Sequence, residues 1–296
     1  MVAILKLVAR LALWIFCPRV RIAGSAFMAS KGPLLIVANH PNSFLDAVIL
    51  GAYYPRKLHF LARGDVFRKP LYGFLLRSIG MIPIHRAREG REHLHLNAGT
   101  FEESVEVLRR GDGLLIFIEG ICLLTHEIQP FKKGATRILE AAQLAGIQPT
   151  IHVVGLGYSD FRAFGKVVHI SIEEFAVEQV FDHARDRLDF NEAVRTQMVR
   201  LVQVPEEVVS VRKGLFYYLN LPYFRFVSDF VWQRTAGTVF YDSVLFGVLL
   251  FTYPIYLVLM AGVFHAFFSV PMAVSILALP LGFRLSCLRI VPKNNQ

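Results

Sequence analysis

"PLLIVANHPNSFLDAVILGAYY" (residues 33–54) joins two apolar segments through a short polar one. Residues 33–39 are a run of large, partly β-branched apolar side chains, which predicts a strand buried on both faces. Residues 43–54 predict a helix, and Pro41 biases His40 toward extended backbone. We therefore expect the helix to begin at Asn42 or Ser43, with His40 in the loop and Asp46 in the first helical turn.

The same alternation of strand and helix continues along the chain. Further strands are predicted at 57–63, 81–86, 113–120, 150–158 and 166–172, and further helices at 70–80, 100–111 and 135–146. Thr100 and Glu103 have the spacing of a helix capping box. Strands that alternate with helices of about ten residues predict an α/β domain, with a largely parallel sheet covered by helices on both faces. Residues 175–212 predict charged helices on its outside.

The two ends of the chain are unusually apolar. Residues 243–283 carry no Asp, Glu, Lys or Arg, and a membrane span needs only about 20 residues. We expect two helices joined near residues 265–271, with basic residues flanking both ends. Residues 1–16 have apolar side chains at helical spacing, interrupted by Lys6 and Arg10, which favours an amphipathic helix lying in a membrane surface. The predicted organisation is an interfacial helix at 1–19, an α/β domain at 20–235 and a membrane hairpin with a basic tail at 236–296.

Composition narrows the class of partner. The 296 residues carry a net charge of +9, but no helix-turn-helix, zinc-finger or RNA-binding aromatic motif is present, so nucleic acid is not expected. An anionic membrane leaflet is the partner that this charge favours. The three cysteines are far apart in the sequence. We therefore expect neither a disulfide framework nor a zinc site.

His40 and Asp46 are the first candidates for chemistry. In parallel sheets, functional residues gather at the carboxyl ends of the strands, and His40 follows the strand at 33–39. A histidine held by a carboxylate is the usual arrangement of a general base. An alternative stays open, because Ser43 and Asp46 also have capping-box spacing and His40 and Asn39 are then ordinary loop residues.

Two later strand ends add a second group of polar residues. Arg86 follows the strand at 81–86, and Glu119 and Gly120 end the strand at 113–120. Lys132 and Lys133 follow in "PFKKG" (130–134). Together with His40 and Asp46, these residues could deprotonate a hydroxyl and hold an anionic acceptor. The alternatives are a solvated basic face for the lysines and a helix-end charge for the arginine.

Three other readings stay open. Cys122 is a candidate acyl-accepting nucleophile, with His126 as a nearby histidine. His85, His93 and His95 are candidate metal ligands, although no Cys or acidic residue stands at ligand spacing. Arg63 either joins the anion site or forms a surface ion pair with Asp65.

The order of these motifs resembles the glycerolipid (lysophosphatidic acid) acyltransferase family over about residues 20–160. The family's first motif is a His and an Asp separated by four residues, and here five separate His40 from Asp46, as in some branches of the family. The second motif, Gly-x-x-Phe-Ile-x-Arg, is matched by "GMIPIHR" (80–86), with Pro83 in the Phe position. The third, Phe-Pro-Glu-Gly-Thr-Arg-Ser, is matched by "FIEGICL" (117–123). Its Glu and Gly are retained and its Thr-Arg pair is not. The fourth, Val-Pro-Val, is reduced to "HVV" (152–154).

The resemblance implies acyl transfer without a metal or redox cofactor. His40, paired with Asp46, would take a proton from the acceptor hydroxyl, which attacks an acyl thioester of coenzyme A or acyl carrier protein. Backbone N–H groups after His40 would stabilise the oxyanion. The substrate-binding candidates are Asn39, Ser43, Arg86, Glu119, Gly120, Lys132 and Lys133.

The resemblance also implies an acceptor and a location. The expected acceptor is a lysophospholipid, with 1-acyl-glycerol 3-phosphate first, and glycerol 3-phosphate or a lyso-aminolipid as alternatives. Cys122 stands where the family has a phosphate-binding arginine, which keeps the lyso-aminolipid in consideration. A non-catalytic lipid-binding protein is the rival that the altered third and fourth motifs favour. We expect a bacterial inner-membrane location with the catalytic domain on the cytoplasmic side.

Overall fold

The computed structural model describes residues 2–85, 95–177, 181, 183–267 and 270–293. Its main sheet has seven strands in the order β1-β7-β6-β2-β5-β3-β4, and every neighbouring pair is parallel except β6 and β7. The strands are β1 (Arg19–Ala23), β2 (Leu34–Ala38), β3 (Leu58–Arg63), β4 (Met81–Ile84), β5 (Gly113–Phe117), β6 (Thr150–Tyr158) and β7 (Val167–Phe175). The predicted α/β fold with a mostly parallel sheet is confirmed.

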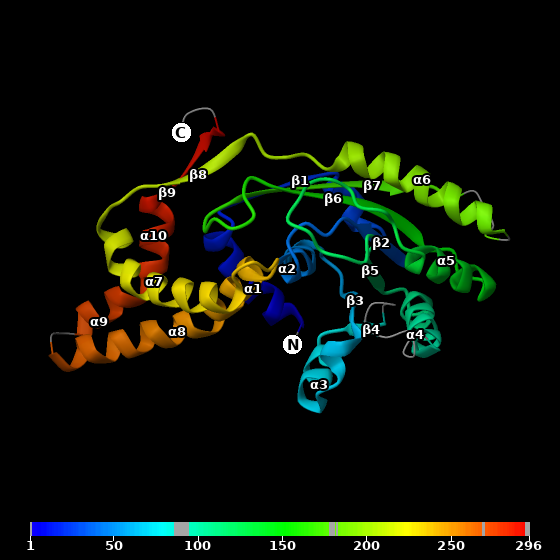
Figure 1. The fold of residues 1–296 in the computed structure, drawn as a ribbon. Coiled ribbons are helices and arrows are strands. Elements are labelled where there is room, and N and C mark those ends of the chain that lie inside the picture. The colour runs from blue at the N-terminus through cyan, green and yellow to red at the C-terminus, as the bar shows by residue number, and fades with distance from the viewer. Residues whose placement is uncertain (1, 86–94, 178–180, 182, 268–269, 294–296) are drawn as a thin grey trace.

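Strand β2 lies at the centre of this sheet and explains why its sequence is apolar throughout. Leu34, Ile36 and Ala38 face a core shared with α1 (Val2–Phe16), α2 (Phe44–Tyr53), α7 (Leu215–Thr235) and α8 (Tyr241–Phe267). Leu35 and Val37 face the opposite core, with α4 (Asn97–Arg109), α5 (Gly134–Leu144) and α6 (Ala184–Leu201). Because side chains alternate along a strand, helices on both faces require apolar residues at every position. Figure 1 shows the two groups of helices on either side of the sheet.

Several local predictions were wrong. Residues 19–23 form an edge strand that was not predicted, and residues 207–211, expected to be helical, form β8 (Glu207–Val211). Helix α4 begins at Asn97, three residues before the expected cap. The Thr100 hydroxyl donates to the carbonyl of Pro83 (2.6 Å) because it lies inside the helix, on the side that faces β4. A capping box at Thr100 and Glu103 is therefore excluded.

The amphipathic N-terminal helix α1 uses its two basic residues to dock onto α2. The Lys6 ammonium donates to the carbonyls of Tyr54 and Arg56 (2.7 and 2.6 Å), and the Arg10 guanidinium donates to the carbonyl of Ala52 (2.7 Å). Cations stabilise the carbonyls that a helix leaves unpaired at its carboxyl end. The opposite side of α1 remains apolar and exposed, with the side chains of Ile4, Leu7, Leu11 and Trp14 in a stripe at helical spacing.

The C-terminal hairpin differs from the prediction in its second limb. Helix α8 is the first limb, and the return is made by two short helices, α9 (Val270–Leu277) and α10 (Leu279–Cys287), which pack against α8 and α7 respectively. Pro280 stands in the first turn of α10, where proline favours the start of a new helix over continuation of the previous one. Strand β9 (Leu288–Pro292) then pairs with β8.

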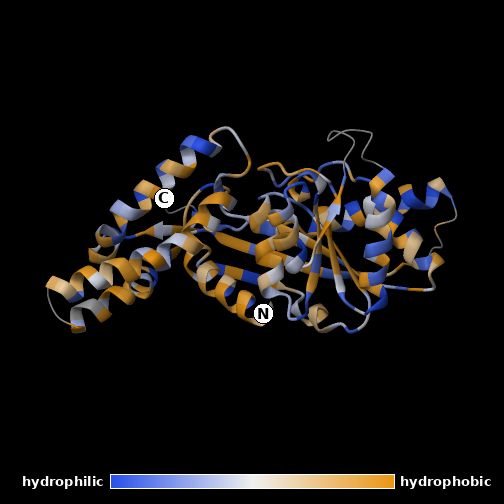
Figure 2. Cartoon of the chain, turned by 90° about the horizontal axis from the view of Figure 1, so that it is seen from below, coloured by the Kyte–Doolittle hydropathy of each residue, from blue (hydrophilic) through white to orange (hydrophobic). Residues whose placement is uncertain are grey.

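One helix among the described residues, α8, is long and apolar enough to cross a membrane, with a mean hydropathy of 2.2. Figure 2 shows that α8 and α9 are mostly hydrophobic along their length. Large side chains such as Phe251 (73% exposed) and Phe226 (72% exposed) point away from the protein. The C-terminal helices therefore present an apolar outer surface as well as an apolar core.

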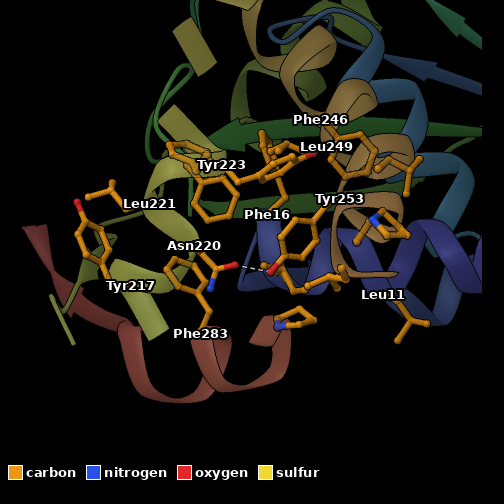
Figure 3. A pocket seen from close by; sticks show the side chains of 18 of the residues that line it. Leu11, Phe16, Tyr217, Asn220, Leu221, Tyr223, Phe246, Leu249, Tyr253 and Phe283 are labelled. Carbon is orange, nitrogen blue, oxygen red and sulfur yellow. Dashed lines mark hydrogen bonds between the residues drawn. The ribbon is translucent and has the colours of Figure 1, made fainter. Parts of the chain in front are cut away.

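An apolar cavity of about 640 Å³ lies between α1, α7, α8 and α10. Figure 3 shows its aromatic walls, including Phe16, Tyr223 and Phe283. Its main polar contact is internal, because the Tyr253 hydroxyl donates to the side-chain oxygen of Asn220. None of its lining residues lines the cavity at His40 that is described next.

Candidate active site

The loop after β2 brings His40 and Asp46 together. The Nδ1 atom of His40 lies 2.9 Å from Oδ2 of Asp46, whose side chain is fully buried. The backbone N–H of Asn42 donates to the same oxygen (2.8 Å), and the Tyr158 hydroxyl donates to Oδ1 (2.6 Å). With Nδ1–H donating to the carboxylate, Nε2 is the nitrogen that carries the lone pair, as a general base requires.

Tyr158 contacts the candidate pair and was not among the predicted site residues. It ends β6, which is parallel to β2, so both strands deliver their terminal residues to the same edge of the sheet. Burial and the neighbouring Asp46 carboxylate raise the pKa of Tyr158 well above its usual value, which keeps the hydroxyl available as a donor. Its backbone N–H donates to Nε2 of His126 (3.0 Å). A polar residue at a strand end was the available signal.

The turn before α2 has an unusual backbone. Ser43 has φ 52° and ψ −138°, a region that costs a non-glycine residue about 1–3 kcal/mol. Its side chain forms no capping hydrogen bond, and the Asp46 carboxylate accepts from Asn42 instead. The capping-box alternative for Ser43 and Asp46 is therefore excluded.

Four backbone N–H groups after His40 already have hydrogen-bond partners inside the protein. The N–H groups of Asn42 and Ser43 donate to the Asp46 carboxylate and to Sγ of Cys122 (3.0 Å), respectively. The N–H of Leu45 donates to the Ser243 hydroxyl (2.9 Å), and that of Asp46 donates to the carbonyl of Ser43 (3.2 Å). These four donors are therefore engaged, while Phe44, which stands between them, lines the cavity at His40. The oxyanion site drawn from the resemblance stays a prediction.

Two residues near the end of β5, Phe117 and Glu119, lie beside the loop that carries His40. The Phe117 ring stacks on the His40 imidazole, with centroids 3.8 Å apart and planes inclined by 10°. Glu119 is 3% exposed, and its carboxylate accepts from the backbone N–H of Gln129 (3.2 Å). Burial raises the pKa of Glu119, while hydrogen bonds from Gln129 and the His40 backbone oppose the rise. This geometry gives Glu119 a role in ordering the loop, and the residue does not line the cavity.

Asn39 also has a structural partner. Its side-chain amide donates to the carbonyl of Leu156 (3.0 Å), and its side-chain oxygen accepts from the N–H of the same residue (2.7 Å). The side chain thus continues the ladder between β2 and β6 by one step. It is 2% exposed, so direct contact with a substrate is not available to it in this geometry.

A cavity of about 800 Å³ opens beside His40 and Ser43. Gly120, Lys132 and Lys133, three of the predicted substrate-binding residues, also line it. Gly120 has φ +63°, and a Cβ atom there would lie 2.8 Å from Cγ of Lys132. Glycine therefore lets the lysine stem pass close to the turn.

All of the charged residues in the described lining of this cavity are basic. Lys132, Lys133, Arg63 and Arg137 contribute cations, and no Asp or Glu contributes to the described lining. Arg63 also pairs with Asp65, so the ion-pair alternative holds, while its part in an anion site stays a prediction. Helix α5 starts at Gly134, directly after the lysines. A helix N-terminus flanked by lysines favours an anion. Arg86 and His93 lie outside the described residues.

Cys122 is a poor candidate for the nucleophile. Burial, with a further contribution from the Asp46 charge, raises the pKa of its thiol to about 12. The protonated thiol is the weakly nucleophilic form. His126, its possible partner by sequence, is already engaged with the Tyr158 backbone.

Replacing Cys122 by serine is therefore expected to keep kcat/KM within about threefold of the wild-type value, because a hydroxyl can also accept the Ser43 N–H. Steady-state kinetics with an acyl thioester measure this. A loss above about 100-fold, together with an acyl group found on Cys122 by mass spectrometry of the quenched reaction, would establish the opposite.

Comparisons with known proteins agree with this arrangement. A family model described as Acyltransferase matches residues 19–159. A 1-acyl-sn-glycerol-3-phosphate acyltransferase of Helicobacter pylori is 36% identical over 121 residues, covering 40% of this chain and 48% of that protein. A probable 1-acyl-sn-glycerol-3-phosphate acyltransferase of Mycoplasma pneumoniae is 22% identical over 167 residues, covering 55% of this chain and 60% of that protein.

A solved structure of the 1-acyl-sn-glycerophosphate (LPA) acyltransferase PlsC from Thermotoga maritima is also similar, with a TM-score of 0.47 and 18% identity, covering 67% of this chain and 79% of that one. The chain spans about half the length of the first curated relatives it matches. The matched segment contains β1–β6, with the His40–Asp46 pair and Glu119 at the carboxyl ends of its strands. Residues 19–159, just under half of the chain, therefore match the Acyltransferase family model and resemble the 1-acyl-sn-glycerol-3-phosphate acyltransferases.

Proposed function

We propose that this protein transfers a fatty acyl group from an acyl thioester to a hydroxyl of a lysophospholipid. The observation that carries the proposal is the His40–Asp46 pair at the wall of a cavity whose charged lining is basic. The pair supplies a general base, and the cavity suits an amphiphile with an anionic head. The match of residues 19–159 to the Acyltransferase family model agrees with both.

In the proposed reaction, Nε2 of His40 takes the proton of the acceptor hydroxyl as its oxygen attacks the thioester carbonyl carbon. The tetrahedral intermediate collapses, the carbon–sulfur bond breaks, and the imidazolium returns the proton to the leaving thiolate. The products are an ester and a free thiol of coenzyme A or acyl carrier protein. The Asp46 carboxylate stabilises the imidazolium formed on the way.

The favoured acceptor is 1-acyl-glycerol 3-phosphate. Lys132, Lys133 and the N-terminus of α5 together offer a site for its phosphate. The relatives described above carry that acceptor in their names. A lyso-aminolipid is the second candidate, because Cys122 replaces the arginine of the third motif and its thiol is engaged with Ser43.

Membrane association is part of the proposal. The exposed apolar stripe of α1 and the outer surface of α8 would enter a bilayer, where burial of apolar area is favourable. The basic residues that flank the C-terminal helices favour the anionic cytoplasmic leaflet.

The acceptor is tested with the full-length protein in lipid nanodiscs, acyl-CoA or acyl-ACP as donor, and a panel of lysophosphatidic acid, glycerol 3-phosphate and a lyso-aminolipid. Turnover with lysophosphatidic acid is expected. The Lys132→Ala/Lys133→Ala variant should raise KM for this acceptor by about 10- to 100-fold, since a charge-assisted hydrogen bond contributes about 1.5–3 kcal/mol.

Lys213→Ala is the matched control, because that lysine is exposed and does not line the cavity. Faster turnover of the lyso-aminolipid than of lysophosphatidic acid would show that the acceptor is not the phosphate-bearing lysolipid. Absence of turnover with every acceptor, alongside lysolipid binding, would favour a non-catalytic lipid-binding protein.

A further inference from the structure

The first turn of α8 contacts the loop that carries His40. The Asn42 side-chain amide donates to Oδ2 of Asp242 (2.7 Å). The Ser243 hydroxyl donates to the carbonyl of Asn42 (3.2 Å) and accepts from the N–H of Leu45 (2.9 Å). These three hydrogen bonds hold the loop on both sides of Ser43, the residue with the strained backbone.

A buried charge fixes the position of Asp242. Lys166, which directly precedes β7, donates its ammonium to Oδ2 of Asp242, and the side chains of the two residues are 0% and 1% exposed. A buried carboxylate is tolerated only when a countercharge and hydrogen bonds surround it. Lys166 and Asn42 meet that requirement at Oδ2 of Asp242, while Oδ1 has no hydrogen-bond partner among the described residues. The aspartate, the lysine and the catalytic loop thus form one buried network.

The residues that hold the loop from the C-terminal side lie outside the segment that matches the family model. Lys166, Asp242 and Ser243 all follow residue 159, where the match to the family ends. The catalytic loop is therefore held from two sides: by Tyr158 and Glu119 within the domain, and by α8 from the C-terminal segment. Phe240, just before α8, also lines the cavity at His40.

We infer that Asp242 and Ser243 are positioning residues, through which α8 holds the His40 loop in its catalytic geometry. The expected effect on kcat rests on the proposed acyl transfer. The positioning of the loop itself rests only on the hydrogen bonds described above. A strained loop relaxes when its anchors are removed, and a small displacement of a catalytic group lowers kcat more than it affects binding.

The test uses Ser243→Ala in the full-length protein. This variant removes no charge and leaves the Leu45 N–H without its acceptor. We expect kcat to fall by about tenfold or more, with KM for donor and acceptor within about threefold of wild type. Ser243→Thr keeps the hydroxyl and should restore most of the loss. Ser228→Ala on α7 is the matched control, because its hydroxyl also donates to a backbone carbonyl (3.0 Å) but lies away from the site.

A second variant, Lys166→Met/Asp242→Leu, removes both buried charges together, which preserves stability better than removing one. It should lower kcat in the same way, because Asn42 loses its anchor. Thermal unfolding of each variant separates a loss of folded protein from a loss of geometry. If both Ser243→Ala and the double variant keep kcat within twofold of wild type per folded molecule, the inference is wrong, whatever their melting temperatures.

A measurement that does not depend on catalytic turnover separates this inference from the proposed function. Carbethoxylation of His40 by diethyl pyrocarbonate, followed by peptide mass spectrometry, reports how firmly the loop is held. The rate should rise several-fold in Ser243→Ala and remain at the wild-type value in Ser228→Ala. If wild type and His40→Ala turn over lysolipids equally, the proposed function fails, while this reactivity still decides whether α8 holds the loop. An unchanged rate would overturn the inference.

Discussion

Replacing His40 by alanine is expected to lower kcat about 10³-fold, with little change in KM. The imidazole is the only base that the Asp46 carboxylate orients in the described structure, and a positioned general base contributes about 10²- to 10⁴-fold to a rate. Steady-state kinetics with acyl-CoA or acyl-ACP and lysophosphatidic acid measure both constants. Because His40 is partly exposed (20%), truncation of its side chain should leave the fold intact.

His95→Ala is the matched histidine control. His95 is an exposed residue that does not line the cavity, so its replacement should leave kcat unchanged. Equal turnover by wild type and His40→Ala would show that acyl transfer at this site is not the activity of the protein. A large loss in His95→Ala would instead revive a role for the histidines of residues 85–95.

Replacing Asp46 by asparagine is expected to lower kcat by about 10²- to 10³-fold. The carboxylate accepts three hydrogen bonds, two at Oδ2 and one at Oδ1. An asparagine oxygen can replace Oδ2, and its amide can donate to the Tyr158 hydroxyl, which then accepts. The variant therefore keeps the neutral histidine in place but removes the charge that stabilises the imidazolium, so kcat falls while KM for the acceptor is maintained.

Tyr158→Phe provides the comparison within the same network. It removes the donor to Oδ1 and leaves the carboxylate charge and the His40 contact in place, so the expected loss is about tenfold or less. The ratio of the two effects distinguishes the charge of Asp46 from its hydrogen bonds. A Tyr158→Phe loss as large as that of Asp46→Asn would place the main contribution in the tyrosine, contrary to this account.

Much of the fold follows from local patterns. The apolar run at 34–38 and the helix at 44–53 lie where their periodicity predicts. The errors occur where tertiary contacts override local signals. Thr100 has a capping pattern, yet its helix starts earlier because the hydroxyl contacts Pro83 across the interface with β4. Residues 207–211 form a strand because residues 288–292 pair with them.

The candidate site could be predicted in part because several of its residues stand next to strand or helix ends. His40, Gly120, Lys132 and Lys133 follow strands or precede a helix, and parallel strands bring their carboxyl ends to one edge. Their presence around one cavity confirms that geometric rule. Asn39 and Glu119 also lie at strand ends, but burial turns their side chains toward backbone partners. Whether a residue is buried depends on the distant segments that pack against it, and a local sequence pattern does not contain that information.

The sequence by itself determined most strands and helices between residues 33 and 172 and the candidate pair His40–Asp46, because each depends on residues close together in the chain. Only the tertiary structure decided what surrounds that pair. The Tyr158 hydroxyl reaches Asp46 across 112 residues, and Asp242 reaches Asn42 across 200. Such contacts arise when the sheet and its covering helices pack into one core, since hydrogen bonds between distant residues become favourable only after that packing has excluded water.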